Sequence, residues 1–312
     1  MPYFFRSFSA YFFGLVHLMR PAEWTKSFGN MLMAVILGAF LYHINVDALL
    51  FLKGFISVAL LWSALYTLND YMDIEVDKLH PTKKLRPIPS GLIPPLHSIV
   101  FFLLLISSSF FLAFQINVFF ALVLSLMTLN QFCYTLKPFE FKKRKIVDLI
   151  SGSMVNPLLR FYAGWLLFIP FFNAPILILL FIVGLQFGGF TLYRLNSKTL
   201  ETKLKYKSSV VRYETRDLQK ASAMAIIISL LSFSLLFINF YLEILPSVLG
   251  FLPPQFLLTA LSAFPFLKNY MNAVFNPLEA DINVLYWQIY FNYLLFIILF
   301  IIVYYLTLYS FF

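Results

Sequence analysis

The segment NDYMDIEVDKLHPTKKLRPIPSG, residues 69–91, is a polar island in an otherwise apolar chain. It carries four carboxylates, then a basic run that ends at Arg86. The whole chain is 61% hydrophobic and 20% aromatic, with a mean hydropathy of +0.84. Charged side chains are costly in hydrocarbon and are kept there mainly for function. We therefore expect this segment to lie where a membrane meets water and to carry chemistry.

The apolar sequence on either side predicts an all-α polytopic membrane protein. Its composition lies far outside that of soluble globular domains. Apolar runs of roughly 18 to 24 residues recur along the chain, which is the length of a membrane-spanning helix. No separate soluble domain is indicated, so we expect one transmembrane domain over residues 1–312. Nine spans are predicted, at 28–45, 47–70, 96–114, 116–135, 146–169, 173–196, 219–242, 247–268 and 286–311.

Residues 1–27 are expected to form an amphipathic helix in the membrane interface. The segment resembles a signal peptide, but it lacks a convincing small-residue cleavage site and runs into Arg20-Pro21. The single cysteine, Cys133, lies within an apolar run, which excludes a disulfide or a thiolate metal site within one chain.

The net charge of +9 is distributed asymmetrically. Of the 23 Lys and Arg residues, all except Lys53 and Arg160 fall on one face of the nine-span topology. Basic loops stay on the cytoplasmic side of a membrane. We therefore expect an integral protein of the cell or inner membrane, with its N-terminus and its active face in the cytoplasm. Basic loops orient any membrane protein, so this pattern alone indicates topology and not chemistry.

The acidic residues of the island follow a helical period. Asn69, Asp73 and Asp77 are spaced i, i+4, i+8, which would stack them on one face of a helix that continues the second span, with Asp70 beside them. Like charges at this spacing repel, so the arrangement needs a cation. Mg²⁺ prefers oxygen ligands and often bridges one or two carboxylates to substrate phosphates. The pattern predicts a site for a Mg²⁺-bound diphosphate.

The basic run after the acidic residues suits phosphate binding or charge balance. Lys83, Lys84 and Arg86 supply the cations. Glu75 points away from the acidic face and is expected to be solvated or ion-paired. His80, a lone histidine before Pro81, is interpreted as structural. The alternative interpretation is a solvated loop that happens to be acidic and then basic.

The island resembles a known family. The pattern NDxxDxxxD followed by RPxxSG is similar to the first Asp-rich motif of the UbiA superfamily of intramembrane prenyltransferases, in the same order and at the end of the second span. The resemblance implies an all-helical bundle around a central cavity, with Mg²⁺ as cofactor. Nine spans agree with that fold.

Most members of that superfamily carry a second Asp-rich motif after the sixth span. The corresponding stretch here, YRLNSKTLETKLKYKSSVVRYETRDLQKAS, is basic, and its only acids are Glu201, Glu214 and Asp217, which form no DxxxD pattern. This departure is similar to the decaprenyl-phosphate phosphoribosyltransferase branch. The resemblance implies 5-phosphoribosyl 1-diphosphate as donor and a polyprenyl phosphate as acceptor.

Four stretches carry the resemblance to that branch. They are RPAEWTKS (20–27), HPTKKLRPI (80–88), Asp148 with Leu159-Arg160 and Ala163-Gly164, and SKTLE with KSSVVRY (197–213). The last match is loose, and either Arg194 or Lys198 can take the family's basic role.

Arg160 lies within a predicted span, where a guanidinium normally faces the bundle interior or water. It is either a structural ion pair or an anion contact in a cavity. Asp148 is 12 residues away, about 18 Å along a helix, and is a poor partner. Tyr134, Lys137 and the run FKKRK at 141–145 are interpreted first as a membrane-anchoring loop, although Lys137 can also reach a phosphate.

These hypotheses give a set of expected site residues. Asp73, Asp77 and Arg160 are expected to be catalytic, and Asn69, Asp73 and Asp77 to hold Mg²⁺. The expected substrate-binding residues are Lys26, Asn69, Asp70, Lys83, Arg86, Tyr134, Lys137, Lys198, Glu201 and Arg212.

The first hypothesis is Mg²⁺-dependent phosphoribosyl transfer to a polyprenyl phosphate. The second is ordinary prenyl transfer from a prenyl diphosphate to an aromatic or lipid acceptor. The third is a non-catalytic binder or transporter of a phosphorylated lipid, although no inverted repeat or paired broken helices are evident. The expected partners are these substrates and the lipid bilayer, with no nucleic acid, and the oligomeric state stays open.

Overall fold

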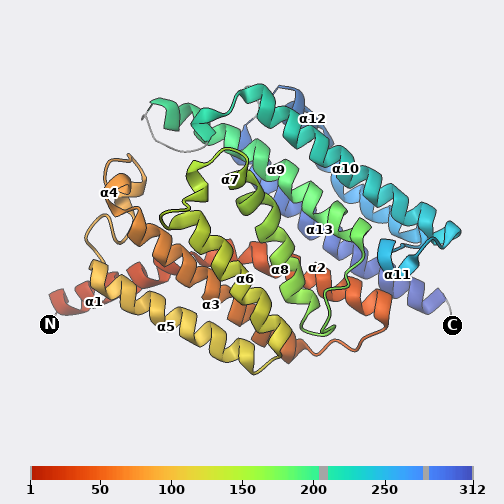
Figure 1. Cartoon of the computed structure of the whole chain (residues 1–312), viewed down its shortest axis with the longest axis horizontal. Coiled ribbons are helices and arrows are strands. Elements are labelled where there is room, and N and C mark those ends of the chain that lie inside the picture. The colour runs from red at the N-terminus through yellow and green to blue at the C-terminus, as the bar shows by residue number, and fades with distance from the viewer. Residues whose placement is uncertain (1, 204–209, 277–280, 311–312) are drawn as a thin grey trace. The chain divides into compact units, whose positions relative to one another are not determined.

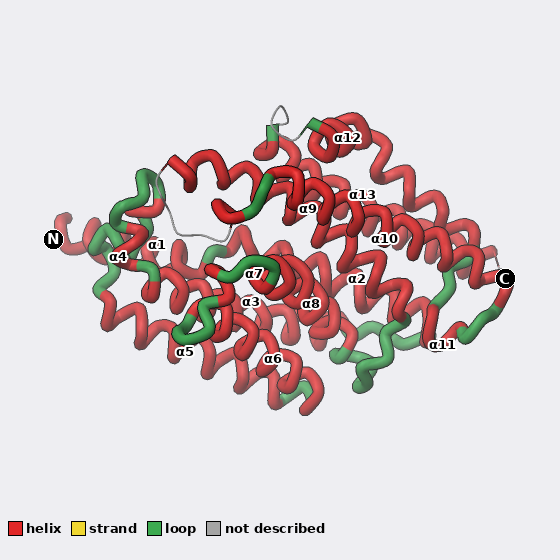
Figure 2. The backbone as a smooth tube through the Cα atoms, turned by 45° about the horizontal axis from the view of Figure 1, so that its top comes forward, coloured by secondary structure: helices red, strands yellow, loops and turns green. Residues whose placement is uncertain are grey.

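The fold is all-α, as expected. The computed structural model describes residues 2–203, 210–276 and 281–310, and these contain helices and loops with no strand (Figures 1 and 2). The main helices are α1 (Pro2–Met19), α2 (Trp24–Tyr42), α3 (Ala48–Met72), α4 (Ile74–Asp77), α5 (Pro95–Phe114), α6 (Val118–Thr135), α7 (Val147–Leu149), α8 (Asn156–Trp165), α9 (Ile176–Lys203), α10 (Thr215–Leu242), α11 (Pro246–Leu249), α12 (Leu267–Phe275) and α13 (Ile282–Ser310). Tighter or wider helical turns join them: η1 (Pro21–Glu23), η2 (Lys83–Leu85), η3 (Phe141–Lys143), the π-helix η4 (Ile150–Val155), η5 (Val210–Arg212) and η6 (Pro254–Phe266).

The chain is a multi-pass membrane protein, but the predicted count of nine spans is not confirmed. Within the described ranges, seven helical runs are long and apolar enough to cross a membrane. The predicted span 146–169 is divided into α7, η4 and α8. Of α9, only Ile176–Leu192 forms an apolar segment, which is shorter than the seven candidate spans.

The N-terminal boundary also differs from the prediction. The second helix begins at Trp24, several residues before the expected start at 28, and η1 joins it closely to α1. Phe8–Tyr42 together form one apolar run. The proposed interfacial position of residues 1–27 stays a prediction.

The described chain divides into two compact units, and the expected single domain over 1–312 stays a prediction. Unit 1 comprises Met1–Ala39, His43–Glu140 and Leu159–Pro170, and unit 2 comprises Phe40–Tyr42, Phe141–Leu158 and Phe171–Phe312.

In unit 1, α3 is the central helix and packs against α1, α5 and α6 (Figure 1). The α3–α5 contact is close because Ser57 and Ser109 each donate a hydrogen bond to the other's carbonyl, at 2.8 and 2.7 Å. Both serines are buried. By donating to a carbonyl of the neighbouring helix, each small hydroxyl group makes its hydrogen bond in an apolar surrounding. The packing holds the polar end of α3, where the island begins.

A second close approach in unit 1 joins α8 to α2. A Cβ at Gly164 would lie 2.3 Å from the carbonyl oxygen of Met31 and 2.5 Å from its Cα. Only glycine allows two backbones to come this near. The contact fixes the position of Arg160, one turn earlier on α8, against α2.

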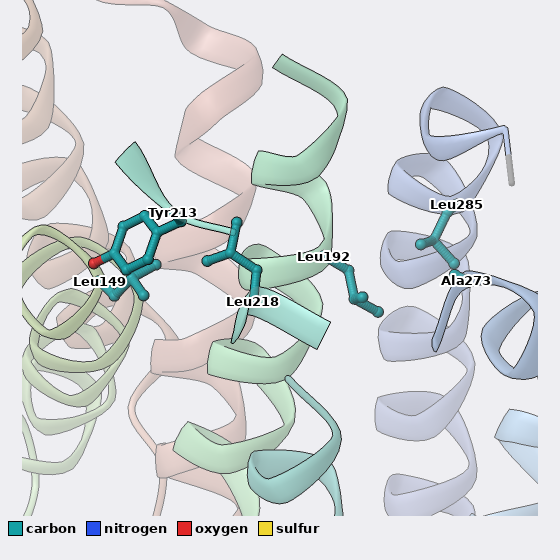
Figure 3. Close-up of a cluster of buried hydrophobic side chains, with 6 residues drawn as sticks. All are labelled: Leu149, Leu192, Tyr213, Leu218, Ala273 and Leu285. Atoms are coloured by element: carbon teal, nitrogen blue, oxygen red, sulfur yellow. The ribbon is translucent and has the colours of Figure 1, made fainter. Parts of the chain in front are cut away.

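In unit 2, α9 and α10 form the main helix pair, and α13 packs against η6 and α9. A buried apolar cluster, shown in Figure 3, comprises Leu149, Leu192, Tyr213, Leu218, Ala273 and Leu285. Its residues come from α7, α9, α10, α12 and α13, and Tyr213 follows η5. The cluster therefore fixes the part of unit 2 that carries Asp148 and Tyr213.

Candidate functional site

The acidic face predicted from the sequence lies at the end of α3, but not on one unbroken helix. The helix ends at Met72, and Asp73 has φ −99° and ψ 7°, after which α4 begins. Backbone hydrogen bonds still join Asp73 N to Asn69 O at 3.1 Å and Asp77 N to Asp73 O at 2.8 Å. The four-residue period is therefore kept across the break, although the single continuous helix was wrong.

Asn69 orients the carboxylate of Asp73. Its amide Nδ2 donates to Asp73 Oδ2 at 3.3 Å, and its Oδ1 accepts a long bond of 3.4 Å from Thr135 of α6. Asp73 is half-buried, and Asn69 is too. The pair therefore lies where α3 meets α6 and stays partly accessible to a ligand.

Arg86 connects the two most buried carboxylates of the island. Its Nη1 donates to Asp70 Oδ1 and to Asp77 Oδ2, at 2.8 Å in each case. The side chains of Asp70 and Asp77 are only 2% and 1% exposed. Buried carboxylates must be paired or hydrogen-bonded. The arginine of RPIPSG thus neutralises the acids of NDYMDIEVD.

Asp77 is only partly satisfied by that contact. Its second oxygen, Oδ1, is buried and has no hydrogen-bond partner in the described part of the chain. Burial raises the pKa of Asp77 above its ordinary value, while the charges of Arg86 and Lys83 act in the opposite direction. A buried oxygen without a donor has coordination capacity left for a cation.

The turn after α4 holds Arg86 and Lys83 in place. His80, which is 5% exposed, accepts bonds at its Nδ1 from the amides of Thr82 and Lys83, each at 3.3 Å. The backbone amide of Ser90 donates to the carbonyl of Arg86 at 3.0 Å. The histidine therefore organises the turn.

Arg20 belongs to the same cluster, although it was not among the expected site residues. Its Nη2 donates to Asp70 Oδ1 at 2.5 Å, and its Cζ lies 4.9 Å from the centre of the Tyr66 ring. Its backbone is left-handed, with φ 51° and ψ 61°, which is uncommon for a residue other than glycine and is often kept at functional sites. The element RPAEWTKS, noted for its resemblance, was the signal for it.

The donor chemistry of this cluster fits Mg²⁺. The described residues contain no group of three or more His, Cys, Asp and Glu side chains arranged to hold a metal. Mg²⁺, however, usually takes one or two carboxylates and completes its shell with water and substrate phosphates. Asp77, through its unpartnered Oδ1, and the half-buried Asp73 are the residues that would hold it.

Arg160 is buried against an aromatic ring. Arg160 is only 5% exposed, and its Cζ lies 4.0 Å from the ring centre of Trp62. Its charge also acts on the carboxylate of Glu23, which forms an ion pair with Lys26 at 2.5 Å. Two of the expected site residues, Lys26 and Arg160, therefore share one carboxylate, and neither Glu23 nor Trp62 was expected in the site.

Unit 2 carries a separate polar cluster around Asp148, which is fully buried. Arg194 forms an ion pair with its carboxylate and donates a second bond to its backbone carbonyl at 3.2 Å. The Tyr213 hydroxyl donates to Asp148 Oδ1 at 2.9 Å and accepts from the amide of Ile146. Burial raises the pKa of Tyr213 to about 12, from 10.0.

The substrate roles of the remaining expected residues stay predictions, and two of these residues, Lys198 and Arg212, have structural contacts. Lys198 donates to the carbonyl of Tyr213 and, at 3.4 Å, to Thr215 Oγ1. Arg212 donates to the carbonyl of Lys143 at 3.0 Å. Tyr134 is half-buried and Lys137 exposed. The side chain of Glu201, and all of residues 204–209 in the basic loop, lie outside the described residues.

The comparisons with known proteins agree with the motifs. The model of the UbiA prenyltransferase family matches residues 31–271. Decaprenyl-phosphate phosphoribosyltransferase of Mycolicibacterium smegmatis is 26% identical over 235 residues, which cover 71% of this chain and 70% of the relative. The enzyme of the same name from Mycobacterium tuberculosis is 35% identical over 85 residues, which are 26% of this chain and 28% of the relative.

Solved structures share the fold. A UbiA homologue from Archaeoglobus fulgidus bound to GPP and Mg²⁺ superposes with a TM-score of 0.67 at 20% identity, over 93% of this chain and 99% of that one. A digeranylgeranylglyceryl phosphate synthase gives a TM-score of 0.63 at 18% identity, over 92% of this chain and 98% of that one. The family model covers well over half of the sequence, so the chain belongs to the UbiA prenyltransferase family of multi-pass membrane transferases.

Proposed function

We propose that this protein transfers 5-phosphoribosyl from 5-phosphoribosyl 1-diphosphate to a polyprenyl phosphate, with Mg²⁺, on the cytoplasmic face of the membrane. One observation carries the proposal. The first acidic motif is present in unit 1, whereas the end of α9, in unit 2, carries Arg194 and Lys198, and this part of the sequence has no second acidic motif of the kind that most of the superfamily carries. A site with one acidic cluster suits a donor other than an ordinary prenyl diphosphate.

The residues around Asp77 would receive the diphosphate of the donor. Bound Mg²⁺ would neutralise the charge that develops on the leaving diphosphate oxygen. Asp73 and Asp77 would hold the ion, with Asn69 orienting the carboxylate of Asp73. Arg86 and Lys83 lie on the same turn and would contact the phosphates, because a guanidinium with several N–H donors can keep its carboxylate contacts and still donate to phosphate.

The reaction needs no strong general base. An oxygen of the polyprenyl phosphate attacks C1 of the ribosyl group, the new C1–O bond forms, and the bond from C1 to the diphosphate breaks. The nucleophile is already anionic, so no proton has to be removed. Lys26 and Arg160 of unit 1 are the proposed groups for orienting the acceptor phosphate, and Lys198, in unit 2, is kept separately as a proposed phosphate contact. This agrees with the histidine of the island, His80, being engaged in a turn.

The similarity to two decaprenyl-phosphate phosphoribosyltransferases supports the phosphoribosyl donor. Ordinary prenyl transfer remains the second candidate function, because the family includes a homologue whose structure holds GPP and Mg²⁺. In that case Mg²⁺ would assist loss of diphosphate from an allylic carbon, and an aromatic or lipid acceptor would capture that carbon.

The two candidates are separated by a labelling experiment. Purified protein, Mg²⁺ and polyprenyl phosphate are incubated with ribose-labelled 5-phosphoribosyl 1-diphosphate, or, in a parallel reaction, with labelled prenyl diphosphate and candidate acceptors. We expect label to enter the lipid fraction only from the ribosyl donor. Label from the prenyl donor alone would overturn the proposal in favour of prenyl transfer.

Asp73→Asn separates an enzyme from a non-catalytic binder or transporter of phosphorylated lipid. The enzyme hypothesis predicts that turnover falls by about a hundredfold or more, since an uncharged amide is a poor Mg²⁺ ligand, while insertion and folding are kept. A binder would retain its lipid binding and show no turnover in either form. The control for loss of charge is Glu75→Gln, because the Glu75 carboxylate is exposed and pairs with Lys78.

A further inference from the structure

Three buried polar groups on contacting helices of unit 1 have no hydrogen-bond partner among the described residues. Arg160 Nε, Trp62 Nε1 and Ser27 Oγ are each buried with no hydrogen-bond partner in the described part of the chain. Their residues are 5%, 3% and 1% exposed. Leaving a buried donor unsatisfied costs about 1 to 3 kcal/mol, and more for a charged group. Three such groups together indicate a ligand that is a strong acceptor.

The contacts place these groups around one point. Arg160 stacks on Trp62, at 4.0 Å from Cζ to the ring centre. Gly164 touches Met31 where α8 meets α2; Arg160 lies one turn before Gly164, and Ser27 one turn before Met31. Gly38 meets Ile169 further along both segments, so the two run in the same direction, and Arg160 and Ser27 lie on the same side of the contact.

The same place is electrically unbalanced. The carboxylate of Glu23 is the acidic group there, and Lys26, Arg160 and Arg20 all act on it. Arg20 is already paired with Asp70. Lys26 and Arg160 together carry two positive charges against the single negative charge of Glu23. A ligand that took the place of this carboxylate would face the charges of Lys26 and Arg160, and two positive charges match a phosphate monoester dianion.

Glu23 and Lys26 are the more exposed residues of this group. Their side chains are 29% and 19% exposed, whereas Arg160, Trp62 and Ser27 are buried. Glu23 is the last residue of η1 and caps α2, and Lys26 lies in the first turn of α2, a helix of 19 residues whose N-terminal end carries a partial positive charge. The ion pair is thus the partly exposed part of a group whose other members are buried.

We infer that Lys26, Ser27, Trp62 and Arg160 form a binding site for the phosphate monoester head of the lipid acceptor, and that Glu23 occupies part of this site until the phosphate displaces it. The inference rests on the proposed function for the identity of the ligand. The carboxylate keeps the cations paired in a low-dielectric surrounding when no lipid is bound, at the expense of affinity. Glu23 is therefore a competitor of the ligand and not a ligand contact.

The test uses full-length protein in detergent and measures the binding of farnesyl phosphate, with farnesol, inorganic phosphate and 5-phosphoribosyl 1-diphosphate as separate ligands. Glu23→Gln keeps the shape of the side chain and removes its charge. It is expected to bind farnesyl phosphate about three- to tenfold more tightly, because about 1 kcal/mol of competing ion pairing is lost. Lys26→Gln is expected to bind it about tenfold more weakly.

Glu75→Gln and Lys78→Gln are the matched controls. Glu75 and Lys78 form another ion pair with the same i, i+3 spacing, in the same unit but exposed to solvent, and both variants should bind like the parent. Farnesol should bind equally to all variants. A parallel change in inorganic phosphate binding would support a phosphate site, and a change confined to 5-phosphoribosyl 1-diphosphate would assign the site to the donor and overturn the inference.

Unchanged or weaker farnesyl phosphate binding by Glu23→Gln would also overturn it, as would unchanged binding by folded Lys26→Gln. These outcomes leave the proposed function standing if label from the ribosyl donor still enters the lipid. Conversely, absence of phosphoribosyl transfer with tighter phosphate binding by Glu23→Gln would reject the proposed function and keep the site.

Discussion

Arg86 Nη1 lies 2.8 Å from Asp77 Oδ2, and the other oxygen of that carboxylate has no hydrogen-bond partner among the described residues. The arginine that follows the acidic motif thus pairs with its last member and, through the same nitrogen, with Asp70. When no metal is bound, Arg86 neutralises part of the negative charge of Asp70 and Asp77.

Arg86→Ala is expected to lower the free energy of unfolding by about 2 kcal/mol, because two buried carboxylates lose a shared counter-charge. Millimolar Mg²⁺ should restore part of the loss, since the ion provides a substitute charge. Thermal unfolding in detergent, with Mg²⁺ and with EDTA, measures both effects. Lys78→Ala removes a solvent-exposed cation from the same turn and should change stability by less than about 0.5 kcal/mol. Equal losses in the two variants would contradict the role of Arg86.

Asp77→Asn is expected to abolish turnover but not folding. Burial already raises the pKa of Asp77, so its ionised form costs stability in the folded protein, and a neutral amide avoids that cost. In EDTA at pH 7, the variant should therefore be at least as stable as the parent. It should also lose the stabilisation by Mg²⁺ that the parent shows. A variant that is less stable in EDTA and keeps the full response to Mg²⁺ would exclude Asp77 as a metal ligand.

Gly164→Ala is expected to destabilise unit 1 by about 2 to 4 kcal/mol, because its new Cβ would overlap the backbone of Met31 and push α8 from α2. The same shift moves Arg160, so binding of farnesyl phosphate should weaken as well. Gly189→Ala is the matched helical control, since its Cβ would meet only the flexible end of Ile289 at 3.2 Å. That variant should remain within about 1 kcal/mol of the parent. Comparable unfolding temperatures for the two variants would show that the close approach is not essential.

Tyr213→Phe is expected to reduce stability by about 1 to 3 kcal/mol, because the buried carboxylate of Asp148 loses a hydrogen bond and the amide of Ile146 loses its acceptor. Arg194 remains paired with Asp148, so the protein should still fold. Unfolding measurements on parent and variant give this difference directly. An unchanged stability would mean that water satisfies both groups.

The same tyrosine gives a pH dependence. Its pKa is about 12 in the folded protein against 10.0 ordinarily, so the neutral hydroxyl stabilises the fold. A raised pKa means that this stabilisation is fully present below pH 10 and is lost as the pH rises towards 12. The stability difference between parent and Tyr213→Phe should therefore be constant up to about pH 10 and then shrink. The other tyrosines are the same in both proteins, so their contributions to the pH dependence cancel in this difference. A difference that grows with pH would contradict the sign of the shift.

The sequence was sufficient for the fold class and for the location of the acidic motif. Hydropathy predicted membrane helices because the bilayer leaves few alternatives for a long apolar run. It did not predict the break at η4 or the early start of α2, because hydropathy does not register a π-helix or a turn joined closely to its neighbour. The four-residue period of Asn69, Asp73 and Asp77 survived as backbone hydrogen bonds, although α3 ends at Met72.

The sequence by itself determined the residue types at the site, namely acids, basic side chains and a buried arginine, and the family to which they belong. Their pairing was decided only by the tertiary structure. Arg20 and Asp70 are 50 residues apart, and Tyr213 and Asp148 are 65 apart. Sequence periodicity reports only neighbours on one helix, whereas ion pairs between helices depend on packing, as at Gly164 against Met31. For that reason the structure, and not the sequence, brought Glu23 and Trp62 next to Arg160.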